Sequence, residues 1–135
     1  MIKQKFKKEI ASLEAIFAFL AKYYERHNLD DSVAFPANFS VEEIFTNMVK
    51  YSPESKNDVL IKLDKKDKKL TIILTDYDVK EFDIKKTPEV DVEQNLKQRK
   101  VGGLGLHLTK KMMDEVNYRY ENKNSIITLV KHLEN

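Results

Sequence analysis

Two pairs of alternating segments limit what this chain can fold into more than any other feature. Apolar residues recur at every second position in 59–64 and 70–75, and a short charged turn joins the two segments. Residues 117–121 and 125–131 form a similar pair, with a turn at 122–124. Alternation of this kind predicts half-buried strands, and a short connection makes them antiparallel. The chain is therefore expected to contain a sheet made mainly of hairpins.

Two helices are expected before the first hairpin, and one between the two hairpins. Residues 11–26 space their apolar side chains by three and four, which predicts an amphipathic helix. Residues 41–51 show the same spacing, after a Pro36 that begins or kinks this helix. Residues 2–8 read as an edge strand whose lysines discourage further pairing. The order predicts one α/β domain over 1–135, a two-layer sandwich whose mixed, mainly antiparallel sheet carries helices on one face.

The composition excludes several classes of protein. The 135 residues include no cysteine, so disulfides and thiolate metal sites are excluded. No apolar run approaches the roughly 18 residues of a membrane helix, and the N-terminus lacks the apolar region of a signal peptide. A cytoplasmic protein without membrane contact is therefore expected. The net charge is only +2, without the concentrated basic face that direct nucleic-acid binding requires.

Three polar side chains form a row on the predicted helix 41–51. Glu43, Asn47 and Lys50 are spaced so that they lie on one helix face. A carboxamide oxygen can ligate magnesium, an ammonium can bind phosphate, and a neighbouring carboxylate can act as a base. The alternative is structural, because Ser40 and Glu43 have the spacing of a capping box, in which Glu43 only satisfies N–H groups at a helix start.

A second set of features lies around the glycines. All three glycines fall between residues 102 and 105, directly before a predicted helix. Such a turn presents N–H groups at the positive end of a helix and is typical of an anion site, although tight loop packing would also require glycine. The segment 85–100 is charged and aperiodic, which predicts a lid or a disordered loop. Asp76 follows a predicted strand, where it can accept a hydrogen bond from an adenine amino group or be an ordinary turn residue.

The combination of these motifs resembles the GHKL ATP-binding superfamily, which includes DNA gyrase and histidine kinases. The stretches EEIFTNMVKYS, residues 42–52, and RKVGGLGLHLTKKMMDEV, residues 99–116, carry the resemblance, which covers nearly the whole chain. The chain resembles most closely the small anti-sigma-factor serine/threonine kinases of bacteria. The resemblance implies the histidine-kinase-like ATPase fold, with 85–100 as the ATP lid.

The resemblance also implies a role for each motif residue. Asn47 would ligate magnesium, Glu43 would be the catalytic base, and Lys50 would lie near the phosphates. Asp76 and Thr128 would hold the adenine. The other nucleotide-binding positions lie at the lid hinge and the glycine turn, namely Arg99, Gly102, Gly103, Leu104, Gly105 and Leu106.

The activity implied by the resemblance is that of an ATP- and magnesium-dependent kinase. Such a protein phosphorylates a STAS-type antagonist protein and sequesters a sigma factor, commonly as a homodimer. One departure bears on this activity, because the family's Asp-x-Gly is here Asp76-Tyr77-Asp78. Asp78 adds a side chain and a negative charge near the expected nucleotide. The alternative is a non-catalytic regulatory binding module of the same fold, with weak or no nucleotide binding.

Overall fold

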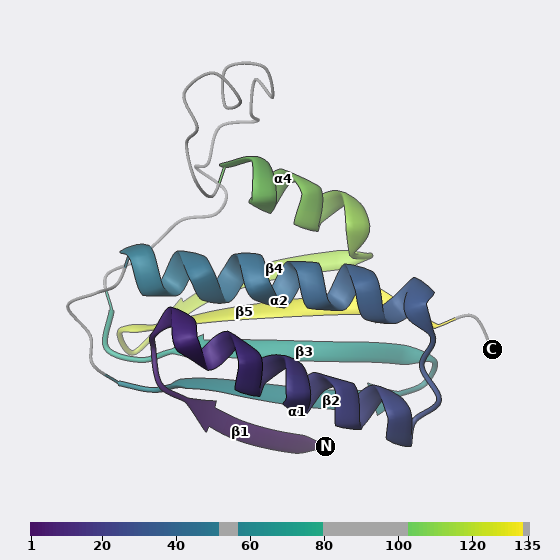
Figure 1. The fold of residues 1–135 in the computed structure, drawn as a ribbon. Coiled ribbons are helices and arrows are strands. Elements are labelled where there is room, and N and C mark those ends of the chain that lie inside the picture. Colours follow the sequence, from purple (N-terminus) through teal and green to yellow (C-terminus); the bar gives the residue numbers. More distant parts are fainter. Residues whose placement is uncertain (52–56, 80–102, 134–135) are drawn as a thin grey trace.

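Five strands form one open antiparallel sheet in the order β1-β2-β3-β5-β4 (Figure 1). The computed structural model describes residues 1–51, 57–79 and 103–133. Each pairing among the described strands is antiparallel. The strands are β1 (Ile2–Phe6), β2 (Val59–Lys66), β3 (Lys69–Asp76), β4 (Glu115–Glu121) and β5 (Asn124–His132).

Two tight turns set the register of the sheet, as the sequence predicts. Asp67 and Lys68 join β2 to β3 with φ of 51° and 60°, and Asn122 and Lys123 join β4 to β5 with φ of 52° and 65°. Positive φ at both central residues is the type I′ geometry, whose twist matches that of the flanking strands. Both predicted hairpins are therefore confirmed.

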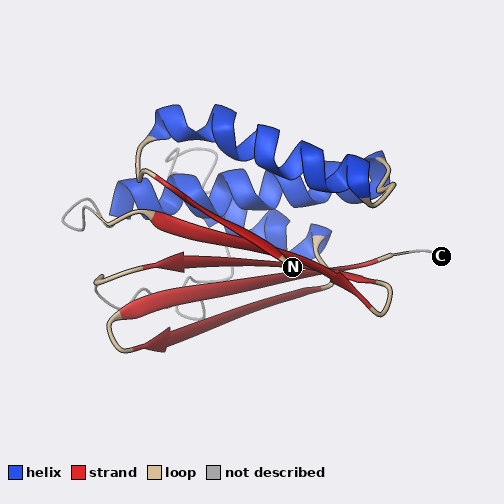
Figure 2. Ribbon diagram, turned by 90° about the horizontal axis from the view of Figure 1, so that it is seen from below, coloured by secondary structure: helices blue, strands red, loops and turns tan. Residues whose placement is uncertain are grey.

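The helices that the structure describes lie on one face of the sheet (Figure 2). The chain passes from β1 through a short 3-10 helix, η1 (Ile10–Ser12), into α1 (Leu13–Arg26), and Asn28 ends this helix with a φ of 55°. Helices α2 (Asp31–Tyr51) and α4 (Gly103–Met112) complete the layer. The predicted fold class, a two-layer α/β sandwich, is confirmed.

Helix α2 differs from its prediction in a way that matters for the site. It begins at Asp31 and runs without a break past Pro36, which lies near its start. The backbone N–H of Ser32 donates to Asp30 Oδ1 at 3.0 Å, so the Asp30 side chain caps the helix. Ser40 is then fully buried in the helix interior. Ser40 and Glu43 are therefore not a capping box, and the structural alternative for Glu43 is wrong.

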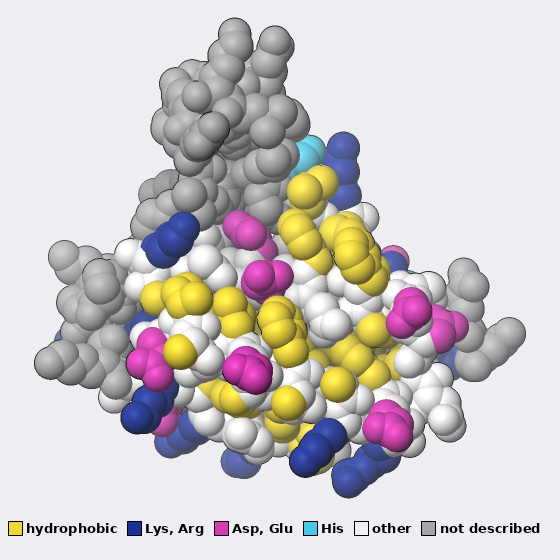
Figure 3. Space-filling model, in the orientation of Figure 1, with side chains coloured by type: hydrophobic (Ala, Val, Ile, Leu, Met, Phe, Trp, Pro, Cys, Tyr) yellow, Lys and Arg dark blue, Asp and Glu magenta, His cyan; other side chains and the backbone are white. Residues whose placement is uncertain are grey.

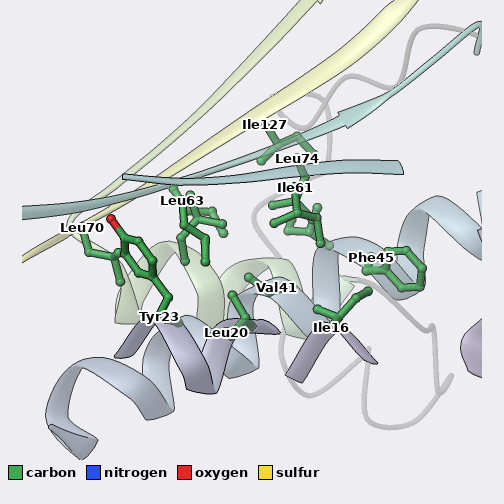
Figure 4. Close-up of a cluster of buried hydrophobic side chains, with 14 of the residues drawn as sticks. Ile16, Leu20, Tyr23, Val41, Phe45, Ile61, Leu63, Leu70, Leu74 and Ile127 are labelled. Atoms are coloured by element: carbon green, nitrogen blue, oxygen red, sulfur yellow. The ribbon is translucent and has the colours of Figure 1, made fainter. Parts of the chain in front are cut away.

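The core lies between the helices and the sheet (Figure 4). Ile16 and Leu20 of α1 and Val41 and Phe45 of α2 are fully buried against the strands. From the sheet, fully buried side chains include Ile61, Leu63, Leu70 and Leu74. Burying one such side chain contributes about 1.5–3 kcal/mol. This core fixes the inner face of α2 and thereby the direction in which its polar row points.

Some expectations concern segments that the structure does not describe. The predicted lid 85–100 lies outside the described residues, and so do Arg99 and Gly102. None of the described helices combines the length and apolar character needed to cross a bilayer.

Candidate functional site

The polar row on α2 contains a buried carboxamide. Asn47 is only 7% exposed, and neither its Oδ1 nor its Nδ2 has a hydrogen-bond partner among the residues that the structure describes. A buried polar group without a partner costs about 1–3 kcal/mol. This cost is offset if a ligand supplies the missing partners. An amide oxygen is also a suitable ligand for magnesium, so the residues present fit such an ion.

Glu43 lies on the same side of α2, one turn before Asn47. Burial raises the pKa of this half-buried carboxyl above its usual value of 4.5, and the charge of Glu42 raises the pKa further. The charge of the exposed Lys50 lowers the pKa of Glu43 and offsets part of this rise. A carboxylate with a raised pKa is a stronger proton acceptor, which is the property that a general base needs.

Asp76 is the last residue of β3 and points toward the helices. Its register partner on β2 is Val59, and the alternating residue Leu74 belongs to the core, so the Asp76 side chain lies on the inner face. The carboxylate is 1% exposed and forms an ion pair with Lys8, whose Nζ lies 2.5 Å from Oδ1. The structure therefore confirms Asp76 at a strand end but also places a buried ammonium beside it.

Ser125 was not among the predicted site residues, although the structure places it opposite Asp76. The two are register partners on β5 and β3, and Ser125 is 5% exposed on the inner face. The hydroxyl of Ser125 lies 3.4 Å from that of Tyr118 on β4. A signal was available in the sequence, because Ser125 is a small polar residue that shares the alternating, inward-facing series of Ile127 and Leu129.

Thr128 lies on the opposite face of the sheet. Its neighbours Ile127 and Leu129 point into the core, so its own side chain points away from the helices. Its register partners are Ile73 and Asn117. The structure thus does not bring Thr128 to Asp76, and the expectation that it holds the adenine conflicts with this geometry because a strand alternates its faces.

Asp78 has the backbone conformation that the family's glycine would adopt freely. Its φ is 54°, in the left-handed region, where aspartate is one of the better tolerated residues. Its side chain is exposed, and its N–H donates to Asn124 Oδ1 at 3.1 Å. The next N–H, of Val79, donates to the carbonyl of Lys123 at 2.8 Å. These two hydrogen bonds attach the chain after β3 to the β4–β5 hairpin.

The glycine turn forms the start of a helix. Helix α4 begins at Gly103 and takes in Leu104, Gly105 and Leu106. The first N–H groups of a helix have no intrahelical partner and lie at its positive end, so this turn can bind an anion. The start of α4, the C-terminal end of α2 and the C-terminal end of β3 all lie toward one end of the molecule (Figure 1). Helix α4 also packs on α2.

The wider surroundings limit what else the site can be. Within residues 1–51, 57–79 and 103–133, no three His, Cys, Asp or Glu side chains gather as a metal site. A cation would therefore need ligands from a phosphate group and water in addition to Asn47. In the view of Figure 3, acidic side chains are scattered over the middle of the face, and most of the basic side chains lie along its lower edge.

Comparisons with known proteins agree with this arrangement. The family model of the histidine kinase-like ATPase domain matches residues 6–131. A chain from the crystal structure of the SiaB–SiaC complex of Pseudomonas aeruginosa has a TM-score of 0.64 at 13% identity, covering 97% of this chain and 88% of that one. The histidine kinase AdeS of Acinetobacter baumannii has a TM-score of 0.56 at 13% identity, covering 100% of this chain and 69% of that one. No curated protein matches the sequence.

The family match covers nearly all of the chain and includes both the α2 row and the start of α4. The protein is thus a histidine kinase-like ATPase domain by family as well as by fold. At 13% identity, the two solved structures show a shared fold.

Proposed function

We propose that this protein binds magnesium-ATP where α2, the end of β3 and the start of α4 meet, and that it acts as a protein serine/threonine kinase. The observation that carries the proposal is Asn47, whose buried amide has no partner among the described residues. Because the chain belongs to a family of ATPase domains, the ligand proposed for this amide is magnesium-ATP.

Each residue near Asn47 has a task in this proposal. Magnesium, when bound, would neutralise charge on the phosphates. Asn47 Oδ1 would hold the ion, and the N–H groups at the start of α4 would bind phosphate oxygens. Glu43 would accept the proton of a serine or threonine hydroxyl as that oxygen attacks the γ-phosphorus and ADP leaves. Lys50 would lie near the phosphates.

The base of the nucleotide would lie at the end of β3. The Asp76 carboxylate would accept a hydrogen bond from the adenine amino group. Ser125, opposite Asp76 on β5, provides a second polar group on the same face. Arg99, Gly102 and the lid 85–100 remain proposals from the family resemblance.

The proposed partners also follow from that resemblance. The substrate would be a STAS-type antagonist protein, and the protein sequestered would be a sigma factor, in a cytoplasmic and commonly homodimeric assembly. A chain of similar fold has been crystallised as part of a two-protein complex, SiaB–SiaC, which supports a partner-binding role.

A second candidate function is a regulatory binding module without catalysis. Two observations favour it, namely the carboxylate of Asp78 and the buried ion pair between Lys8 and Asp76. The buried Asn47 and the raised pKa of Glu43 favour the kinase.

Titration calorimetry with ATP, with and without magnesium, tests the shared requirement for nucleotide. The kinase proposal predicts binding that magnesium strengthens, followed by transfer of the γ-phosphate to a protein co-purified from the native cell. Absence of heat at millimolar ATP, in a sample shown to be folded by circular dichroism, would refute the kinase and leave the binding module.

A further inference from the structure

Lys8 buries its ammonium group at the position where the proposed nucleotide would place its base. The Lys8 side chain is 4% exposed and the Asp76 side chain 1% exposed, with 2.5 Å between Nζ and Oδ1. A lysine is almost never buried to this degree unless it is paired. Lys8 belongs to none of the family motifs, so its burial calls for a separate explanation.

The register of the sheet explains how Lys8 reaches Asp76. Phe6, the last residue of β1, is the partner of Val59 on β2, and Val59 is the partner of Asp76 on β3. These three residues thus form one row across three strands. Phe6 is buried and packs edge-on against Phe19, with ring centroids 5.5 Å apart, which fixes the end of β1. Lys8 follows β1 by two residues and pairs with Asp76 at the end of β3, although β2 lies between these strands.

Adenine and Lys8 would make incompatible demands on Asp76. Both offer N–H donors to the same buried carboxylate, but the ammonium carries a charge and the adenine amino group does not. An ammonium can stay buried only while it is paired. Because Lys8 lies against Oδ1 and the Asp76 side chain is only 1% exposed, adenine can reach this carboxylate only if Lys8 withdraws toward water.

We propose that Lys8 is an internal competitor for the carboxylate that recognises adenine. The pair holds the nucleotide-free protein in a closed arrangement at the end of β3, and ATP binds with an affinity reduced by the work of displacing Lys8. Lys8 thereby sets the nucleotide affinity without contacting the phosphates. This inference rests on the proposed function, because it requires that Asp76 receives a base.

The test compares Lys8→Met and Lys8→Gln with Lys7→Met. Each change removes one positive charge, so all three alter the attraction of the protein for an anionic nucleotide to a similar extent. Lys7 is exposed and adjacent in sequence, which makes it the matched control. Methionine preserves the length of the buried side chain, and glutamine offers Asp76 a neutral donor if methionine leaves the protein unstable.

The Lys8 variants should bind ATP about tenfold more tightly than Lys7→Met, which is a difference of about 1.4 kcal/mol in binding free energy. GTP, which carries a carbonyl where adenine carries its amino group, should gain nothing. Tight binding by a Lys8 variant when the native protein does not bind would also support the inference.

Two results would overturn it in distinguishable ways. If the native protein binds ATP and neither Lys8 variant binds it more tightly than Lys7→Met, Lys8 supports Asp76 instead of competing for it, and the proposed function stands. If folded samples of the native protein and all variants fail to bind ATP, the inference and the proposed function fail together.

Discussion

Asp76 and Ser125 face each other across β3 and β5, and both side chains are buried on the face of the sheet that carries the helices. Thr128 lies further along β5, on the other face. Ser125 and Thr128 therefore belong to different surfaces. Only Ser125 is placed to act together with Asp76 on a bound base.

The first prediction separates these two positions. Ser125→Ala should weaken ATP binding by about threefold to tenfold, the effect of losing one neutral hydrogen bond. Thr128→Ala removes a hydroxyl of the same kind from the opposite face and should leave affinity unchanged. Titration calorimetry of both variants with ATP, at the same magnesium concentration, measures the two affinities. Equal losses in the two, or a loss in Thr128→Ala alone, would contradict the geometry.

Local patterns were sufficient to predict much of the fold. Alternation in 59–64 and 70–75 gave the first hairpin, because the side-chain period of a strand is visible in sequence. The three-and-four spacing of 11–26 likewise gave α1. The left-handed conformation of Asn28 at the end of α1 follows the known preference of asparagine at that position.

The features that sequence missed depend on tertiary context. Pro36 is the sixth residue of α2 and removes one N–H bond inside the helix, but α2 continues because Ala37 and Val41 after it are fully buried in the core. In α4 the apolar Leu108 is exposed and the polar Thr109 is fully buried, the reverse of what their polarity alone predicts. The packing of α4 against α2 determines which side of α4 is buried.

In the candidate site, too, some features follow from local sequence and others depend on the tertiary structure. Glu43, Asn47 and Lys50 share a row because helix geometry alone puts them there. The face of Thr128 follows from its place between Ile127 and Leu129, but only the register of β5 on β3 shows that Ser125, and not Thr128, lies opposite Asp76. The ion pair between Lys8 and Asp76 could be predicted only from the order of the strands, because β2 lies between β1 and β3.

The second prediction concerns the cost of keeping Asn47. Asn47→Leu replaces a buried amide without a partner in the described chain by an apolar group of similar size. Such a replacement is nearly neutral or stabilising, so the melting temperature without nucleotide should stay the same or rise. ATP binding should lose its magnesium dependence. Coinciding titration curves with magnesium and with EDTA would show this, and a native magnesium response in Asn47→Leu would refute the role.

The third prediction concerns the residue in the place of a family glycine. Asp78→Gly preserves the positive φ and removes a carboxylate, so ATP affinity should rise a few-fold at low salt and less at high salt. Asp78→Asn keeps the side chain without its charge and is the matched control. A gain in both variants assigns the effect to charge, and a gain in glycine alone assigns it to the side chain. A loss of affinity in Asp78→Gly would show that the carboxylate assists binding.

The fourth prediction concerns the titration of Glu43. Its pKa in the folded protein is raised above the usual 4.5, so the native state binds this proton more tightly than the unfolded chain. The resulting stability is present below pH 4.5 and is lost as the pH rises through the raised pKa. Glu43→Gln cannot titrate and should gain stability relative to the native protein over that interval. Urea denaturation at a series of pH values measures the difference, and parallel curves would contradict the raised pKa.

The same substitution separates catalysis from binding. Glutamine keeps the size of Glu43 and cannot accept a proton, so ATP affinity should survive while phosphotransfer falls by roughly a hundredfold or more, the scale of losing a general base. In the native protein, the rate should fall as the pH drops through the raised pKa of Glu43, because the base becomes protonated. In Glu43→Gln this limb of the profile should disappear. The neighbouring, exposed Glu42→Gln is the control, which should keep this limb but move it to lower pH, because the charge of Glu42 raises the pKa of Glu43. A Glu43→Gln protein that phosphorylates its partner at the native rate would show that Glu43 is not the catalytic base. A capping role would not account for Glu43 either, since its helix begins at Asp31.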